Sequence, residues 1–140
     1  MSDLKRFLEA QKDDYDIALA EIRSGHKGSH WIWYIFPQIA GLGFSSTAHY
    51  YAIKDRQEAE DYINDEILRN RLIEISEALL SLDSDDAEDV MGYPDDLKLR
   101  SSMTLFNTVA PEIGVFQKVL DKFYDGEADQ RTLDLLSKGH

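Results

Sequence analysis

The sequence predicts an all-α protein, a single compact domain of about seven helices that spans residues 1–140. Two observations support this fold class. Apolar residues recur at steps of three and four over most of the chain, and this spacing is typical of one face of a helix. No internal repeat, low-complexity tract or linker rich in proline, glycine and serine divides the chain, so we expect one domain.

The N-terminal region predicts a pair of helices. A short first helix covers residues 4–8, behind a candidate cap at Asp3. Helical spacing then continues over residues 15–22 and stops at Gly25, a residue type that is common just after a helix C-terminus.

The segment from Trp31 to Phe36 is the exception to the helical pattern, because its β-branched and aromatic residues favour a strand. It has no evident partner strand, and a buried strand without a partner cannot satisfy its backbone groups. We therefore expect a short buried helix or turn that ends at Pro37.

The strongest helical signal covers residues 55–82. Its first part reaches Asp65, and beyond that residue apolar side chains recur at steps of four and three. These side chains are Leu68, Leu72, Ile75, Leu79 and Leu82. The second part should be a long core helix.

The acidic run 83–89 predicts a connection with one short turn, followed by a helix with Pro94 at its first position. Residues 97–106 are apolar on almost all sides, so this helix should be central, and it should end before Pro111. Two further packing helices complete the chain. They cover residues 112–124 and 128–138.

The charge balance limits the classes of partner. Fifteen Lys and Arg residues stand against 27 Asp and Glu, which gives a net charge of −12. This balance argues against binding to nucleic acid or to an anionic membrane, since both draw on Lys and Arg. The absence of cysteine excludes disulfides, Cys-ligated metals and a thiol nucleophile. With no membrane-length apolar run or basic leader, the expected location is the cytoplasm.

Hydrogen-bonding groups and large aromatic rings gather between residues 29 and 38, where flanking glycines allow close approach of a ligand. They are Ser29, His30, Trp31, Trp33, Tyr34 and Gln38. This composition suits a pocket for a flat or sugar-bearing ligand. In the alternative reading, the aromatic residues belong to the core, Ser29 caps a turn and His30 makes a structural hydrogen bond.

A second polar group lies near the N-terminus of the expected central helix, where a phosphate or carboxylate could be held. It consists of Lys98, Arg100, Ser101 and Ser102. In the alternative reading, Asp96 and Arg100 form an ion pair one helical turn apart, and Asp95 or a distant acid neutralises Lys98.

We predict no metal site and no cofactor. His26 and His30 are four residues apart and His49 is a possible third ligand, but Gly28 weakens the helix that would align the first two. The acidic run lacks the ligand and the glycine of an EF-hand loop, because it has Ala87 and Glu88 at those positions. No hydrolase elbow or dinucleotide fingerprint is present either.

Two blocks, residues 28–43 and 94–106, resemble the signature stretches of a bacterial family, domain of unknown function 1810. The resemblance implies a single-domain all-α protein with no established activity. Some members carry the label calpastatin-like, but calpastatin's inhibitory segments are disordered, whereas this chain is predicted to form a packed core.

The stretch from His49 to Tyr51, with Lys54, is similar to a His-Tyr-aromatic stretch of the NADAR family. That resemblance implies ADP-ribose or riboside ligands and makes His49 a candidate binding residue. The NADAR family has an acid just before the histidine, but this chain has Ala48, so no catalytic carboxylate carries over.

Together these observations give the leading hypothesis of a cytoplasmic protein that binds a small anionic, nucleotide- or ADP-ribose-like molecule, with hydrolysis of a glycosidic bond as a possible reaction. Trp31 or Trp33 would stack on the ligand, and Lys98 and Arg100 would hold its charge. The acid–base candidates are His30, Asp95 and Asp96.

Two alternatives involve no small ligand. In the first, exposed aromatic residues between 31 and 36 bind a protein partner, or they bind a second copy of the chain so that two copies form a homodimer. In the second, the buried polar groups only fix the fold. The sequence does not choose among the three.

Overall fold

The computed structural model describes residues 3–138, and in this range the chain forms nine α-helices and no strand. They are α1 (Lys5–Ser24), α2 (Ile32–Ile35), α3 (Ser46–Tyr51), α4 (Arg56–Asn64), α5 (Glu66–Leu80), α6 (Ala87–Met91), α7 (Asp95–Val109), α8 (Val115–Tyr124) and α9 (Gln130–Lys138). The all-α class is confirmed. The expected count of about seven helices is wrong, because helices such as α3 and α6 have six residues or fewer and show little periodicity.

The expected N-terminal helix pair is one continuous helix, α1. Gln11 lies between the two apolar stretches and is buried, so the pattern looks interrupted although the helix is not. Its amide nitrogen donates to the carbonyl of Tyr34 at 2.8 Å and to the hydroxyl of Tyr62 at 3.0 Å. Asp3 is not the cap, since Leu4 holds the N-cap position, but the helix ends at Gly25 as expected, with φ of 94°.

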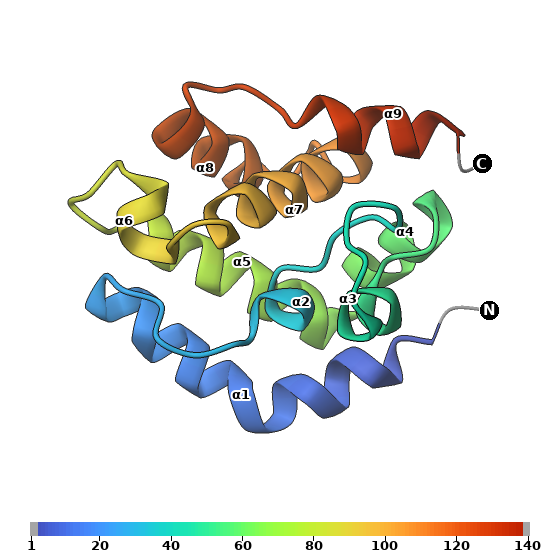
Figure 1. Ribbon diagram of the computed structural model, residues 1–140, viewed down its shortest axis with the longest axis horizontal. Helices are drawn as coiled ribbons and strands as arrows, with labels where there is room; N and C mark the ends of the chain where they lie inside the picture. The colour runs from blue at the N-terminus through green and yellow to red at the C-terminus, as the bar shows by residue number, and fades with distance from the viewer. Residues whose placement is uncertain (1–2, 139–140) are drawn as a thin grey trace.

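Helix α7 runs through the middle of the molecule, as the sequence predicts. Figure 1 shows α1 along the lower side and α8 and α9 along the upper side, with α5 and α7 between them. Residues 101–106 are all buried, because α7 packs against α2, α4, α6, α8 and α9. Pro94 holds the N-cap position of α7 and not its first helical position.

The segment between α2 and α4 positions the candidate site. Where the sequence predicts a short helix or turn up to Pro37, residues 32–35 form a short helix that ends at Ile35, and the chain then pairs briefly with residue Ile53. The amide of Ile53 donates to the carbonyl of Gln38, and the amide of Ala40 donates to the carbonyl of Ile53, both at 2.8 Å. Helix α3, which the sequence did not predict, lies in the sequence between Ile39 and Ile53, the two residues of this single bridge.

Arg6 of α1 fixes the end of α3. Its guanidinium donates to the carbonyls of Tyr50 and Ala52, both at 2.8 Å. It also forms an ion pair of 2.8 Å with Glu58 of α4, and both side chains are buried.

No helix among residues 3–138 is both long and apolar enough to cross a membrane.

Candidate functional site

The carboxylate of Glu21 orders the loop between α1 and α2. It accepts hydrogen bonds from the amides of Gly28 and Ser29 at 2.7 and 2.9 Å, and from the Ser29 hydroxyl at 2.5 Å. The indole nitrogen of Trp31 donates to it at 2.8 Å. Burial raises the pKa of Glu21, but the bonds from Ser29, Gly28 and Trp31 outweigh burial and lower the pKa to about 2.

Several candidate residues of this loop are therefore held in the fold. Ser29 and Trp31 are bound to Glu21, and Trp31 is only 1% exposed. The hydroxyl of Tyr34 donates to Asp14. His30 is exposed, and it lies outside the two cavities described next.

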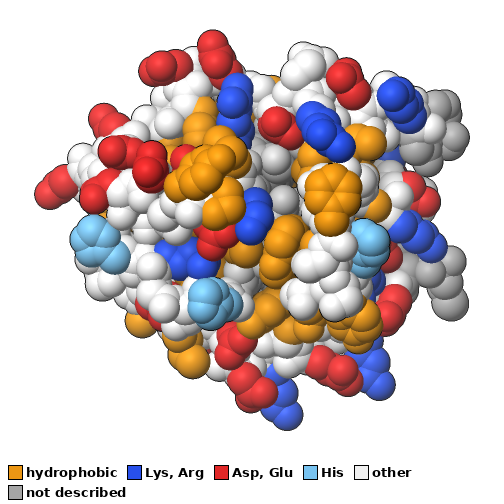
Figure 2. All heavy atoms as spheres, in the orientation of Figure 1, with side chains coloured by type: hydrophobic (Ala, Val, Ile, Leu, Met, Phe, Trp, Pro, Cys, Tyr) orange, Lys and Arg blue, Asp and Glu red, His pale blue; other side chains and the backbone are white. Residues whose placement is uncertain are grey.

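A cavity of about 320 Å³ lies between the loop after α2 and the N-terminal part of α7. Its lining residues are Trp33, Gln38, Leu42, Gly43, Pro94, Leu97, Lys98, Arg100, Ser101 and Asp129. The two candidate segments of the sequence meet here, because Trp33 and Gln38 come from the first and Lys98, Arg100 and Ser101 from the second. In Figure 2, hydrophobic side chains lie beside Lys or Arg side chains in the middle of this face.

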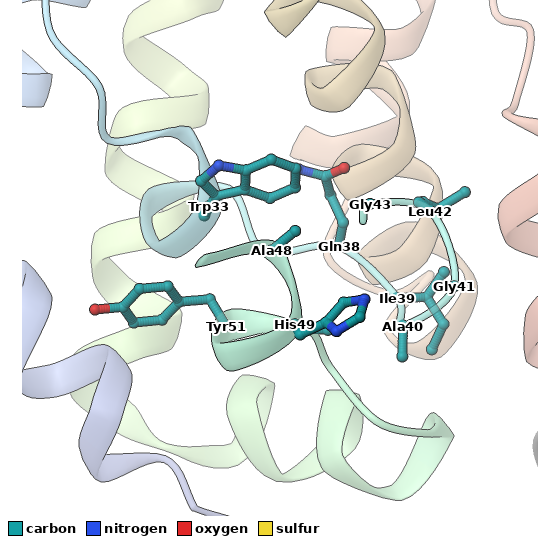
Figure 3. A pocket seen from close by; sticks show the side chains of 11 residues that line it. Trp33, Gln38, Ile39, Ala40, Gly41, Leu42, Gly43, Ala48, His49 and Tyr51 are labelled. Carbon is teal, nitrogen blue, oxygen red and sulfur yellow. The ribbon is translucent and has the colours of Figure 1, made fainter. Parts of the chain in front are cut away.

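A smaller cavity of about 190 Å³ adjoins the first and shares four lining residues with it. Its lining residues are Trp33, Gln38, Ile39, Ala40, Gly41, Leu42, Gly43, Ala48, His49, Tyr51 and Ala52. In Figure 3 the ring of His49 points toward the stretch that carries Ala40 and Gly41. His49, predicted from its stretch alone, thus lies in the smaller cavity and not with Lys98.

Two lysines share one carboxylate beside the larger cavity. Asp95 is 2.7 Å from the ammonium of Lys27 and 3.1 Å from that of Lys98. Partial burial raises the pKa of Asp95, but its bonds to the two lysines outweigh burial and lower it. The ammonium of Lys98 also lies 4.5 Å from the centre of the Trp33 ring. One positive charge of this group is left unbalanced by Asp95.

Arg100 and Ser101 contact the segment before α9. The guanidinium of Arg100 donates to the carbonyls of Glu127 and Ala128, both at 3.0 Å, and lies 3.5 Å from the Glu127 carboxylate. The ion pair with Asp96, which belongs to the alternative interpretation of the sequence, is not formed among the described residues, where Glu127 is the carboxylate next to Arg100. The hydroxyl of Ser101 lies 3.1 Å from the Asp129 carboxylate, which also caps α9 by accepting from the amide of Thr132.

Gln38 stands at the boundary of the two cavities. Its side chain is buried, with 5% of the residue exposed. The backbone carbonyl of Gln38 accepts a hydrogen bond from the backbone amide of Ile53, and this bond holds the backbone in place. The amide nitrogen of the side chain, however, has no hydrogen-bond partner among the described residues.

The remaining candidates lie elsewhere. Asp96 lines a separate acidic depression with Asp85, Asp86 and Glu88, and its carbonyl accepts a bond of 2.5 Å from the Tyr124 hydroxyl. Ser102 is fully buried in α7. The acid–base candidates His30, Asp95 and Asp96 line neither the larger nor the smaller cavity, so their catalytic roles stay predictions. Residues 3–138 contain no group of three or more His, Asp or Glu arranged to hold a metal.

Comparison with known proteins gives the same assignment as the two sequence blocks. A family model described as "Protein of unknown function (DUF1810)" matches residues 1–136. The chain belongs to the DUF1810 family. A search of proteins with curated functions finds no match.

The fold of this DUF1810 chain is similar to that of a solved structure. The crystal structure of the conserved hypothetical protein Rv1873 from Mycobacterium tuberculosis superposes with a TM-score of 0.94 and shares 41% sequence identity. The match covers 96% of each chain. The family and the solved structure thus support the fold and name no function, so a function has to be inferred from the chemistry of the cavities.

Sequence reasoning missed four residues that shape the site of this DUF1810 protein. Lys27 and Asp129 were missed because their partners are distant in the sequence, although Asp129 has the spacing of a helix cap before Thr132. Leu42 and Gly43 line both cavities. Gly43 had a signal, because a glycine permits close approach: a Cβ atom there would lie 2.6 Å from that of Ala48.

Proposed function

We propose that this DUF1810 protein binds a small anionic molecule of nucleotide or ADP-ribose type in the larger cavity. The observation that carries the proposal is the placement of Lys98. Lys98 is a lining residue of the cavity, and its ammonium lies over the Trp33 ring and shares the Asp95 carboxylate with a second lysine. A surplus cation beside an aromatic ring suits a ligand that joins a negative charge to a flat or sugar ring.

Charge and hydrogen bonding support an anionic ligand at this position. Arg100 and Ser101 line the cavity with Lys98, and a guanidinium carries further N–H donors besides those given to Glu127 and Ala128. The chain as a whole has a net charge of −12, whereas this cavity is lined by two cations and one carboxylate, that of Asp129. Local cations raise the concentration of an anion in a cleft.

Size and aromatic surface also support the proposal. A volume of about 320 Å³ lies at the lower end of the range of about 300–1,000 Å³ for small-molecule sites. Trp33 is the partly exposed tryptophan and lines both cavities, whereas Trp31 is buried. Trp33 therefore takes the stacking role that the sequence left open between the two.

Thermal unfolding with and without ligand tests the proposal. Ribose 5-phosphate, AMP and ADP-ribose are the probes, and a ligand at 100 times its Kd stabilises a protein by about 2.7 kcal/mol, a rise of several degrees in Tm. The variant Lys98→Met should lose this response. Lys118→Met, which removes the same charge from an exposed position of α8, is the control and should retain it.

Two results would overturn the proposal. One is a Tm that does not move with any of the probes at millimolar concentration. The other is a Lys98→Met protein that responds as the unaltered protein does. The first result, combined with a dimeric state in solution, would favour the interaction module that the sequence leaves as the alternative.

A further inference from the structure

We propose that the smaller cavity receives an uncharged ring of the same ligand, and that the side-chain amide of Gln38 donates a hydrogen bond to an acceptor on that ring. The ligand class is then a nucleoside monophosphate, with its phosphate at Lys98 and its base in the smaller cavity. This inference rests on the proposed function and adds a second subsite and an orientation to it.

The first argument is the state of Gln38. Its amide nitrogen is buried and has no partner among the described residues, and the side chain lines both cavities. A buried donor without an acceptor is unfavourable, so native structures rarely keep one without a reason. The backbone carbonyl of Gln38 accepts a hydrogen bond from the amide of Ile53, which places the start of the side chain at this boundary. An acceptor on a ligand would satisfy it.

The second argument is the lining of the smaller cavity. It contains no Lys, Arg, Asp or Glu from the described residues, and aliphatic and aromatic side chains form most of it. A charged group would lose its hydration there without gaining a partner. The polar side chains available are Gln38 and His49, because Figure 3 shows the hydroxyl of Tyr51 pointing away from the other lining residues; two polar groups suit an uncharged ring with a few polar edges.

The third argument is the order of the two cavities along one ligand. They share Trp33, Gln38, Leu42 and Gly43, so a molecule that spans both must pass Trp33 and Gln38. Lys98 and Arg100 line only the larger cavity, and His49 lines only the smaller one. A molecule with one anionic end and one uncharged ring therefore has a single orientation in which both ends are matched.

Calorimetric titration with divided probes tests this arrangement. Ribose 5-phosphate represents the anionic end, the four ribonucleosides represent the uncharged end, and AMP, GMP, CMP and UMP join the two. We expect at least one nucleotide to bind about tenfold more tightly than ribose 5-phosphate. In Gln38→Met, which keeps the length of the side chain, this preference should fall to about twofold, while the affinity for ribose 5-phosphate stays the same.

Two variants should each weaken the binding of a different end of the ligand. Lys98→Met should weaken the binding of ribose 5-phosphate and leave the binding of the preferred nucleoside unchanged. Gln38→Met should weaken the binding of the nucleoside and leave that of ribose 5-phosphate unchanged. Gln38→Met should also melt at the same temperature as the unaltered protein or a higher one, because it removes an unsatisfied buried donor. A structural role of Gln38 would instead lower the Tm.

A second variant reaches the smaller cavity without altering Gln38. In Gly43→Ala the new Cβ would lie 2.6 Å from Ala48 and 3.0 Å from Trp33, so the loop has to shift. This variant should also lose the preference for nucleotides. Gly114→Ala, where no atom lies within 4 Å, is the matched control and should keep it.

The outcomes separate this inference from the proposed function. If ribose 5-phosphate binds as tightly as every nucleotide, or if Gln38→Met and Gly43→Ala both keep the preference, the second subsite is wrong and the anion site stands. If no phosphate-bearing probe binds, the proposed function fails and the inference fails with it.

Discussion

The indole nitrogen of Trp31 donates a hydrogen bond of 2.8 Å to the carboxylate of Glu21. This bond, with those from Gly28 and Ser29 to the same carboxylate, directs Trp31 into the core and leaves Trp33, two residues later, to line the cavities. Glu21 accepts the bonds as an anion, so the stability of the loop depends on pH.

The first prediction concerns Glu21→Gln. The pKa of Glu21 is about 2 in the folded protein and 4.5 ordinarily, so its contribution to stability is complete above pH 4.5 and is lost as the pH falls through 2. A neutral amide accepts these bonds less well, so at pH 6 the variant should be less stable by about 1 kcal/mol or more. Urea unfolding at pH 6, 4 and 3 should show the difference from the unaltered protein becoming smaller.

Glu9→Gln is the control for this series, because Glu9 is exposed and its ion pair with Lys5 is 3.9 Å long. It should follow the unaltered protein at every pH. A difference between Glu21→Gln and the unaltered protein that stays constant from pH 6 to pH 3 would contradict the role of the charged carboxylate.

The second prediction concerns the ion pair between Arg6 and Glu58, whose side chains are 5% and 3% exposed. Removing one partner leaves a buried charge, so Arg6→Met should cost about 3–5 kcal/mol of the free energy of unfolding. Arg6→Met also removes the bonds that hold the end of α3 at Tyr50 and Ala52. Chemical denaturation measures the loss.

A matched pair on the surface provides the comparison. Arg56 and Glu60 lie 3.2 Å apart, but both are well exposed, so Arg56→Met should cost about 0.5 kcal/mol or less. The double variant Arg6→Met with Glu58→Leu should be more stable than Arg6→Met alone, because no unpaired charge stays buried. Equal losses for Arg6→Met and Arg56→Met would show that burial of the pair has no energetic role.

The third prediction separates the two tryptophans, which are the only ones in the chain. Trp31→Phe removes the donor to Glu21 and part of the core, so it should cost about 2–4 kcal/mol. Trp33→Phe should cost less, since Trp33 is partly exposed. Each variant keeps one indole, so fluorescence should respond to AMP in Trp31→Phe and not in Trp33→Phe. The reverse pattern would place the ligand away from both cavities.

The sequence predicts the long helices well because their periodicity is local. Helices α5 and α7 carry apolar residues at every turn, and both lie where the spacing indicates. Local spacing fails where a long-range contact decides. Gln11 interrupts the pattern of α1 because it binds Tyr34 and Tyr62, and the six residues of α3 bury only Ala48, so no apolar face is visible.

For the candidate site, the sequence finds the chemical groups but not their neighbours. Trp33, Gln38 and Lys98 were chosen for their side chains, and the fold places all three at the larger cavity. The choice between Trp31 and Trp33 depends on Glu21, and the partner of Arg100 is the segment before α9 and not Asp96. Such contacts depend on tertiary packing, which spacing along the chain does not contain.

The fourth prediction concerns the carboxylate that Lys27 and Lys98 share. Lys27 has a side chain only 6% exposed, and its ammonium contacts Asp95 at 2.7 Å and the carbonyl of Ser29 at 2.5 Å. Asp95→Asn removes the only carboxylate paired with this buried ammonium among the described residues, so it should cost about 3–5 kcal/mol. Lys98→Met should cost less than about 1 kcal/mol, because Lys27 keeps Asp95 and Lys98 is 26% exposed.

Urea unfolding at pH 7 measures both variants, and their order is the decisive result. The two lysines lower the pKa of Asp95, so the carboxylate is charged at neutral pH. The Asp95→Asn variant therefore shows the whole effect of this charge on the free energy of unfolding at pH 7. If Lys98→Met were as destabilising as Asp95→Asn, Lys98 would be a structural partner of Asp95, and its loss of ligand binding could then be ascribed to unfolding. If Asp95→Asn alone is costly, Lys27 and Asp95 form the support, and Lys98 is the cation that this support leaves available to an anion in the cavity.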